Sequence, residues 1–256
     1  MTRHVRVATE AGTPPSAPDT HPGVRRGVVE GELVVLEDGS VLRLAEARLL
    51  PPVTPSKIVC VGRNYAEHAK ELGNAVPTEP LIFLKPPSSL NAHRGEVVYP
   101  PISQLLSYEG EVGVVVGRRA RHVRAEHALD YVAGYTIVND VTARDLQKKD
   151  GQWTRGKGFD SFCPVGPWWT PKEEVEFGNL RVVTRLNGEV KQDAPVTDMI
   201  FDVGAIIQFV TEFMTLEPGD LIATGTPPGV GAMEAGDLVE VEVTGLGMLE
   251  NRVIRG

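Results

Sequence analysis

Cysteine, basic charge and long apolar runs are all scarce in this sequence of 256 residues. The only two cysteines, Cys60 and Cys163, lack the short spacing of a zinc site. The 26 basic residues are outnumbered by 34 acidic ones, and the net charge of -8 argues against a nucleic-acid surface. No apolar run approaches the roughly 18 residues of a membrane span, and the N-terminus lacks the apolar segment of a secretory signal. We therefore expect a cytoplasmic protein that binds neither nucleic acid nor membranes.

Proline-rich segments divide the chain. Residues 9–23 contain four prolines and almost no large apolar side chain, which predicts a loop or a mobile insert. Residues 49–56 are also rich in proline and are predicted to be a linker. We accordingly predict a small N-terminal β subdomain over residues 1–55 and a main domain over residues 56–256.

Short β patterns dominate and helices are few. Turn pairs at Asp38-Gly39 and Asn187-Gly188 predict hairpins. The clearest helix pattern covers residues 202–214, with Asp202 as N-cap and an apolar stripe facing the core, predicted to end at Phe213 and Met214. Without a strict alternation of strands and helices, the pattern predicts an α+β fold that is mainly β.

Two glutamates lead into a run of valines in "SYEGEVGVVV", residues 107–116. Positions two apart on a strand face the same side, so Glu109 and Glu111 share a face. Two like charges about 4 Å apart repel by about 4 kcal/mol at an effective dielectric constant of 20. Two interpretations follow: an edge strand with both glutamates in water, or a buried pair that needs a cation.

Asp140 ends the predicted strand "YTIVND" and directly precedes a predicted helix. One interpretation makes it the N-cap of that helix. The other joins its carboxylate to Glu109 and Glu111, because three carboxylates from two strands form the all-oxygen site that Mg²⁺ prefers.

Three further segments carry residues of catalytic type. His68 and Glu71 are three positions apart on a predicted helix, either as a surface ion pair or as a base oriented by a carboxylate. Lys157 lies in a glycine-punctuated loop, where it is either solvated or placed to stabilise an oxyanion. Thr226, in the turn "TGTPPGVG" at residues 224–231, either only helps to reverse the chain or holds a carboxylate together with backbone N–H groups.

Taken together and in this order, "GRNYAEHAKE", "YEGEVGVVVG", "YTIVNDVTARDLQ", "RGKGFDSFCPVGP" and "TGTPPGVG" resemble the fumarylacetoacetate hydrolase (FAH) family. The resemblance runs from about Lys57 to the C-terminus. It implies a mixed β-roll catalytic domain, usually in homodimers, with Mg²⁺, Mn²⁺ or Ca²⁺ bound by Glu109, Glu111 and Asp140. It also implies a small-molecule substrate with a 2-oxo acid head that chelates the metal and passes through an enolate.

The resemblance implies roles for the remaining residues. Lys157 would stabilise the enolate, and His68 and Glu71 would form a dyad on a mobile lid helix. The segment 69–80 is then predicted to be poorly ordered until a ligand binds. Substrate contacts are implied for Arg63, Tyr65, Arg144, Gln147 and Thr226.

One departure from the family pattern concerns the substrate. The larger hydrolases that cleave fumarylacetoacetate carry an extra aspartate ligand upstream of the histidine, where this chain has Arg63 and Asn64. Fumarylacetoacetate itself is therefore not expected as the substrate. The short single-copy form, with "LLPPVTPSKIVCVGRNYAEH", is most similar to chains assigned as 2-hydroxyhepta-2,4-diene-1,7-dioate isomerase of aromatic catabolism.

Three alternatives to this isomerase stay open. A fumarylpyruvate-type acylpyruvate hydrolase and an oxaloacetate decarboxylase would use the same metal-stabilised enolate. A catalytically silent metal- or ligand-binding member is the third, and the presence of His68, Glu71 and Lys157 argues against it.

Overall fold

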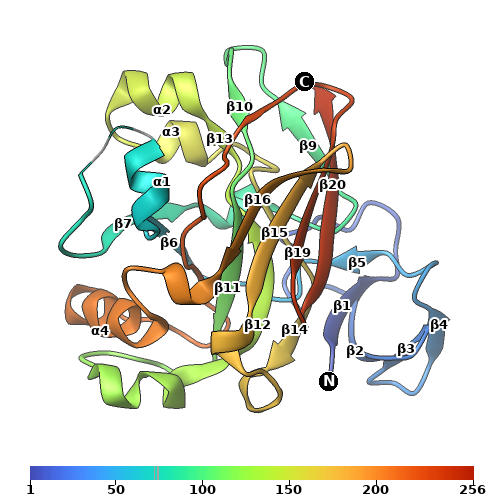
Figure 1. Cartoon of the computed structure of the whole chain (residues 1–256). Helices are drawn as coiled ribbons and strands as arrows, with labels where there is room; N and C mark the ends of the chain where they lie inside the picture. The colour runs from blue at the N-terminus through green and yellow to red at the C-terminus, as the bar shows by residue number, and fades with distance from the viewer. Residues whose placement is uncertain (72, 74) are drawn as a thin grey trace.

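The computed structural model describes residues 1–71, 73 and 75–256 (Figure 1). Part of the predicted lid segment, Leu72 and Asn74, therefore lies outside the described residues. Strands hold 40% of the chain and helices 19%, which confirms the predicted α+β fold that is mainly β.

The largest sheet runs through the whole molecule. Two short strands lie off its main path, β5 (Leu49–Leu50) beside β1 and β8 (Leu90–Asn91) beside β14. The main path, in spatial order, is β4 (Val41–Arg43), β3 (Leu33–Leu36), β2 (Val24–Glu30), β1 (His4–Ala8), β14 (Cys163–Pro171), β12 (Val132–Asn139), β11 (Gly110–Val116), β17 (Leu221–Ala223), β6 (Ile58–Gly62) and β7 (Leu81–Lys85).

Two smaller sheets complete the β structure. One has five strands, in the order β16 (Glu189–Pro195), β15 (Arg181–Leu186), β19 (Leu238–Val243), β20 (Gly247–Arg255) and β9 (Glu96–Tyr99). The other has three, β13 (Thr142–Ala143), β10 (Leu106–Ser107) and β18 (Ala232–Met233). The predicted hairpin at Asn187-Gly188 joins β15 to β16, and both turn residues have positive φ, as a type I′ turn requires.

The α-helices lie on one side of the central strands, among them β11, β12 and β14, and β1–β5 lie on the other side (Figure 1). The helices are α1 (Ala66–Glu71), α2 (Arg144–Asp150), α3 (Thr154–Lys157) and α4 (Val203–Phe213). Short 3₁₀ helices occur at η1 (Pro87–Ser89), η2 (Ala125–Tyr131), η3 (Lys172–Glu174), η4 (Phe177–Asn179) and η5 (Val196–Asp198).

Helix α4 largely follows its sequence pattern. The Asp202 carboxylate caps it by accepting a hydrogen bond from the Ala205 N–H at 2.8 Å, as predicted. Ile206 and Val210 are buried in the main core, together with valines of β11 and β19. The prediction for Phe213 was wrong: its side chain is 54% exposed and packs edge-on against Phe209 on the helix surface.

The N-terminal segment is better anchored than its composition indicates. Residues 9–23, all of them described, contain turns but neither helix nor strand, so the loop is confirmed. Thr13 and Ala17 are nevertheless buried, and Arg6 of β1 donates hydrogen bonds to the Asp19 carboxylate at 2.6 Å and to the Ala17 carbonyl. Polar contacts to a buried arginine thus anchor the segment, together with a small apolar cluster of Ala17, Val24 and Leu50. The division into domains 1–55 and 56–256 stays a prediction.

Candidate active site

Glu111 lies on β11, a central strand of the large sheet, and Glu109 directly precedes this strand. Strand β11 is flanked by β12 on one side and β17 on the other. Both glutamates are buried, with 5% and 1% of their surfaces exposed. The edge-strand interpretation is therefore wrong, and the two charges need compensation inside the protein.

The glycine between the two glutamates allows the sheets to meet. A Cβ on Gly110 would lie 2.2 Å from Thr184 Oγ1 and 2.9 Å from a methyl group of Val241, both on the five-stranded sheet. Any larger residue would force β15 and β19 away from β11. Gly110 therefore brings this sheet against the backbone that carries the carboxylates.

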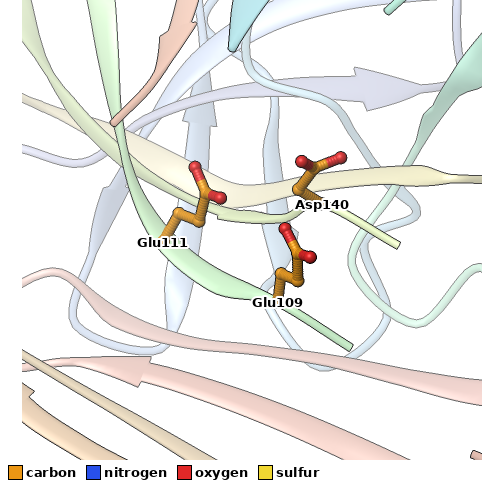
Figure 2. A group of neighbouring side chains, drawn as sticks. All are labelled: Glu109, Glu111 and Asp140. Carbon is orange, nitrogen blue, oxygen red and sulfur yellow. The ribbon is translucent and has the colours of Figure 1, made fainter. Parts of the chain in front are cut away.

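Asp140 joins the two glutamates from the neighbouring strand. It follows β12 directly, and its N–H donates to the Glu109 carbonyl at 2.8 Å. The N-cap interpretation is wrong, because β13 intervenes and the N-cap of α2 is Ala143. One carboxylate oxygen from each of the three residues lies within 4.8 Å of the others, and all three carboxylates turn toward one small region (Figure 2).

Two of the three carboxylates are paired with buried cations. Lys157 Nζ lies 2.8 Å from Glu109 Oε2 and 2.5 Å from Asp140 Oδ2. Lys85 Nζ lies 2.5 Å from Asp140 Oδ1, and the Arg144 guanidinium forms an ion pair with Glu109. Burial alone would raise the pKa of Glu109, but Arg144 and Lys157 hold that pKa below its usual range.

Glu111 is the carboxylate without such a partner. Its Oε2 accepts a hydrogen bond from the Gly225 N–H at 2.8 Å, but no cationic side chain of the described residues lies within 4.0 Å of it. Burial, followed by the charges of Asp140 and Glu109, raises the pKa of Glu111 well above its usual value. The triad thus contains one uncompensated buried carboxyl group.

This donor set fits a hard divalent cation. Three buried carboxylates supply only oxygen ligands, which Mg²⁺ and Mn²⁺ prefer. A cation at the point where the three meet would also supply the positive charge that Glu111 lacks. Glu109, Glu111 and Asp140 are therefore the residues that would hold the metal.

The dyad residues meet on α1. His68 Nδ1 lies 3.2 Å from Glu71 Oε2, and Glu71 also accepts hydrogen bonds from the Gly229 N–H at 3.1 and 3.2 Å. His68 is buried, so the interpretation as a surface ion pair is wrong. Burial lowers the pKa of His68 although Glu109 opposes this shift, so the imidazole is neutral at pH 7.

Most of the predicted residues line one cavity of about 360 Å³. Its lining consists of Val61, Gly62, Arg63, His68, Glu109, Arg144, Gln147, Lys148, Trp153, Lys157 and Thr226. A larger cavity of about 1030 Å³ lies against the N-terminal strands, and no predicted site residue lines it. The charged groups in the smaller cavity make it the candidate active site.

Two predicted substrate contacts have other surroundings than expected. The Thr226 hydroxyl already donates to the Gly110 carbonyl at 2.9 Å and accepts from Gln192 Nε2 at 2.8 Å. Tyr65 is buried and forms an isolated antiparallel β-bridge with Met199. It is not among the described residues that line the cavity. Binding of substrate by these two residues stays a prediction, as it does for Arg63, Arg144 and Gln147.

Sequence reasoning missed Lys85 and Gln192. A signal for Lys85 existed, because a lysine that ends the apolar strand "PLIFLK" is rarely buried without an anionic partner. Gln192 gave no such signal, since it lies in an ordinary hairpin strand. It binds Gly110 N–H and the Thr226 hydroxyl, and so fixes the backbone between the two glutamates.

The chain is similar to known proteins over most of its length. The model of the family described as "Fumarylacetoacetate (FAA) hydrolase C-terminal" matches residues 57–254. The human mitochondrial oxaloacetate tautomerase FAHD2B is 44% identical over 225 residues, which cover 84% of this chain and 72% of that protein.

Among the described residues, no helix has the length and apolar character that a membrane span requires.

Two solved structures are similar over most of the chain. The 2-hydroxyhepta-2,4-diene-1,7-dioate isomerase from Mycobacterium marinum has a TM-score of 0.86 and 41% identity, covering 100% of this chain and 99% of that one. A fumarylpyruvate hydrolase from Pseudomonas aeruginosa, in complex with Mn²⁺ and pyruvate, has a TM-score of 0.75 and 34% identity, covering 80% and 91%.

Proposed function

The chain belongs to the fumarylacetoacetate hydrolase family, and from that premise we propose that it is a divalent-metal-dependent enzyme acting on 2-oxo or 2-hydroxy-dienoate acids. The observation that carries this proposal is the buried triad of Glu109, Glu111 and Asp140, with Lys157 and His68 lining the adjacent cavity. Mg²⁺ is the proposed metal, with Mn²⁺ and Ca²⁺ as alternatives.

Glu109, Glu111 and Asp140 would hold the cation, which when bound would act as a Lewis acid for the 2-oxo acid head of the substrate. Lys157 would contribute a second positive charge at the same end of the cavity. Although burial lowers its pKa, Asp140 and Glu109 raise it more, so Lys157 stays protonated at pH 7. A preorganised cation of this kind stabilises developing negative charge in a dry site.

His68 would move the proton. The contact between its Nδ1 and the Glu71 carboxylate favours the tautomer with hydrogen on Nδ1, which leaves a free lone pair on Nε2. Glu71 is itself held by the Gly229 N–H, so the ring has a fixed orientation. A neutral, oriented imidazole is suited to take a proton from one atom of the substrate and return it to another.

Isomerisation of the 2-hydroxyhepta-2,4-diene-1,7-dioate type is the leading activity. It needs one proton taken from oxygen and one given to carbon, which a single base beside a stabilised enolate can perform. Both the Mycobacterium marinum isomerase and the human oxaloacetate tautomerase are named for such proton transfers. Both names support this choice of reaction.

Hydrolysis of an acylpyruvate is the second candidate. His68 would then activate a water molecule instead of moving a substrate proton. The Pseudomonas aeruginosa hydrolase, bound to Mn²⁺ and pyruvate, supports this alternative. Oxaloacetate decarboxylation is a third outcome of the same enolate chemistry. A catalytically silent member is disfavoured by the buried ion pairs of Lys157.

We further propose that the enzyme is a cytoplasmic homodimer and that its active site binds a small 2-oxo acid. The deciding experiment is a steady-state assay with Mg²⁺ and with Mn²⁺ on a dienoate, acetylpyruvate and oxaloacetate. Glu111→Gln protein is the matched inactive control. Metal-dependent turnover of one of these substrates is expected, whereas equal rates with EDTA would contradict the proposal.

A further inference from the structure

The cavity is cationic in a protein that is acidic overall. Its lining contains four cationic side chains but only one carboxylate, that of Glu109, although the whole chain carries a net charge of -8. Arg144 and Lys157 are paired with Glu109. Among the described residues, no carboxylate lies within 4.0 Å of the other two cations, Arg63 and Lys148. Two cations are therefore left for a ligand.

Arg63 is held rigidly at the cavity wall. Its φ of 57° is uncommon for an arginine, so surrounding contacts must enforce it. Asn64 supplies them: its side chain donates to the carbonyls of Thr224 and Phe201 at 2.7 and 2.9 Å, and accepts from the Phe201 N–H at 2.8 Å. Because Arg63 does not have a helical conformation, helix α1 begins only at Ala66.

Trp153 fixes the direction of the Arg63 side chain. The Arg63 Cζ lies 5.8 Å from the centre of the Trp153 ring, within the range of a cation–π contact. The ring is packed edge-on against Phe83, and a Cβ on Gly62 would lie only 2.8 Å from it. The Trp153 carbonyl accepts the Lys157 N–H at 2.9 Å, so one continuous wall connects Arg63 to Lys157.

The cavity has a buried end and an open end. Lys157, Glu109 and Thr226 are buried, whereas Arg63 and Trp153 are half-buried and Lys148 is exposed. Arg63 and Trp153 also line a neighbouring, more open cleft along β7, which places them where the cavity meets the surface. A substrate with its 2-oxo head beside Lys157 would extend its other end toward Arg63 and Lys148.

We propose that Arg63, assisted by Lys148, binds a second carboxylate at the far end of the substrate, so that the enzyme selects dicarboxylic over monocarboxylic 2-oxo acids. This inference rests on the proposed function, because it requires the 2-oxo head at the triad. Arginine suits the role, since its planar guanidinium binds a carboxylate through two parallel hydrogen bonds. Lys148 adds an exposed positive charge, whose attraction for the carboxylate is weakened by salt.

The test compares two acids of equal length, 2-oxoglutarate and 2-oxovalerate, which differ only in the terminal group. Calorimetric titration of the Mn²⁺-loaded protein measures both affinities without relying on turnover. We expect the wild type to bind 2-oxoglutarate at least about 10-fold more tightly. Arg63→Gln should lose about 10- to 100-fold in affinity for 2-oxoglutarate and no more than about 2-fold for 2-oxovalerate.

Further variants protect the test from misfolding and from general charge effects. Arg63→Asn suits the positive φ, since asparagine adopts it readily, and should show the same loss, while Arg63→Lys should restore part of the selectivity. Lys148→Gln should lose about 2- to 5-fold for 2-oxoglutarate, and less in 0.5 M NaCl. Lys149→Gln, one position along the same helix and outside the lining, should change neither affinity.

The outcomes separate this inference from the proposed function. Equal losses for both acids in the Arg63 variants would mean that Arg63 only shapes the cavity, and would overturn the inference. Equal binding of both acids by the wild type would overturn it while leaving the proposed function intact. If neither acid binds to the Mn²⁺-loaded protein, both fail.

Discussion

Replacing each triad carboxylate by its amide should separate charge compensation from metal binding. Glu109→Gln, Glu111→Gln and Asp140→Asn each replace an anionic carboxylate ligand by a neutral amide, so all three should abolish Mn²⁺ binding and activity. Their effects on the metal-free protein should differ in sign, because the three carboxylates differ in their partners.

Glu111→Gln should stabilise the metal-free protein. In its ionised form, Glu111 would be repelled by about 3.5 kcal/mol by a like charge at 4.8 Å, at an effective dielectric constant of 20, and no cation of the described residues within 4.0 Å would offset this. The raised pKa also means that the folded state retains a proton which the unfolded chain releases above about pH 4.3. Each pH unit above that value, up to the folded pKa, costs about 1.4 kcal/mol. Glutamine avoids this cost, so we expect a gain of about 2 kcal/mol, or about 4–8 °C in Tm.

Asp140→Asn and Glu109→Gln should destabilise the metal-free protein. Asp140 is bound by both Lys85 and Lys157, and Glu109 by Lys157 and Arg144. Removing one partner of a buried ion pair costs about 3–5 kcal/mol, because the other charge stays buried. The expected fall in Tm is about 6–20 °C.

Differential scanning calorimetry in EDTA at pH 7, with Mn²⁺ titration of the same samples, measures both effects. Far-ultraviolet circular dichroism controls for an intact fold. A Tm shift of the same sign in all three variants would refute the charge assignment, and retained Mn²⁺ affinity in all three would refute the site.

The remaining predictions concern single side chains. Lys157→Met should raise the activation barrier for every substrate by about 3 kcal/mol. His68→Ala should slow hydrolysis or proton transfer about 10²–10⁴-fold and decarboxylation less. Equal losses of kcat/KM in His68→Ala on acetylpyruvate, a dienoate and oxaloacetate would contradict this division of roles. Lys85→Met should lower the free energy of unfolding by about 3 kcal/mol, more than Lys57→Met, because the Asp220 partner of Lys57 keeps several N–H donors. Burial lowers the pKa of His93 to about 4, so the free energy of unfolding should fall as pH falls from about 6.5 toward 4, because the unfolded chain binds the proton first. In urea unfolding measured across this pH range, His93→Gln should reduce that fall by up to about 3 kcal/mol. An unchanged pH dependence in the variant would count against this prediction.

The sequence placed the three carboxylates as candidates, and the resemblance to the FAH family favoured the triad over the edge-strand and N-cap interpretations. The period of two along a strand places Glu109 and Glu111 on one face, and the strand end at Asp140 marks the neighbouring position. Their burial was not predictable from that segment alone. It depends on β17 pairing with β11 across more than a hundred residues.

The compensating contacts come from distant segments. Lys85 reaches Asp140 from β7, and Gln192 reaches Gly110 from β16, each through the pairing of strands far apart in the chain. The parallel pair of β20 with β9 is equally remote, and periodicity carries no information on such partners. The conformation of Arg63 likewise depends on Asn64 contacts to residues 201 and 224, which no local pattern records.

The central claim is that the triad holds a divalent cation that carries the head of a 2-oxo acid. A calorimetric titration of the wild type and of Glu111→Gln with Mn²⁺, followed by oxalate, tests this claim most directly. We predict one Mn²⁺ per wild-type chain, oxalate binding only after the metal is bound, and loss of both in the folded variant. Oxalate binding of equal strength in EDTA, or Mn²⁺ binding to Glu111→Gln with wild-type affinity, would contradict it.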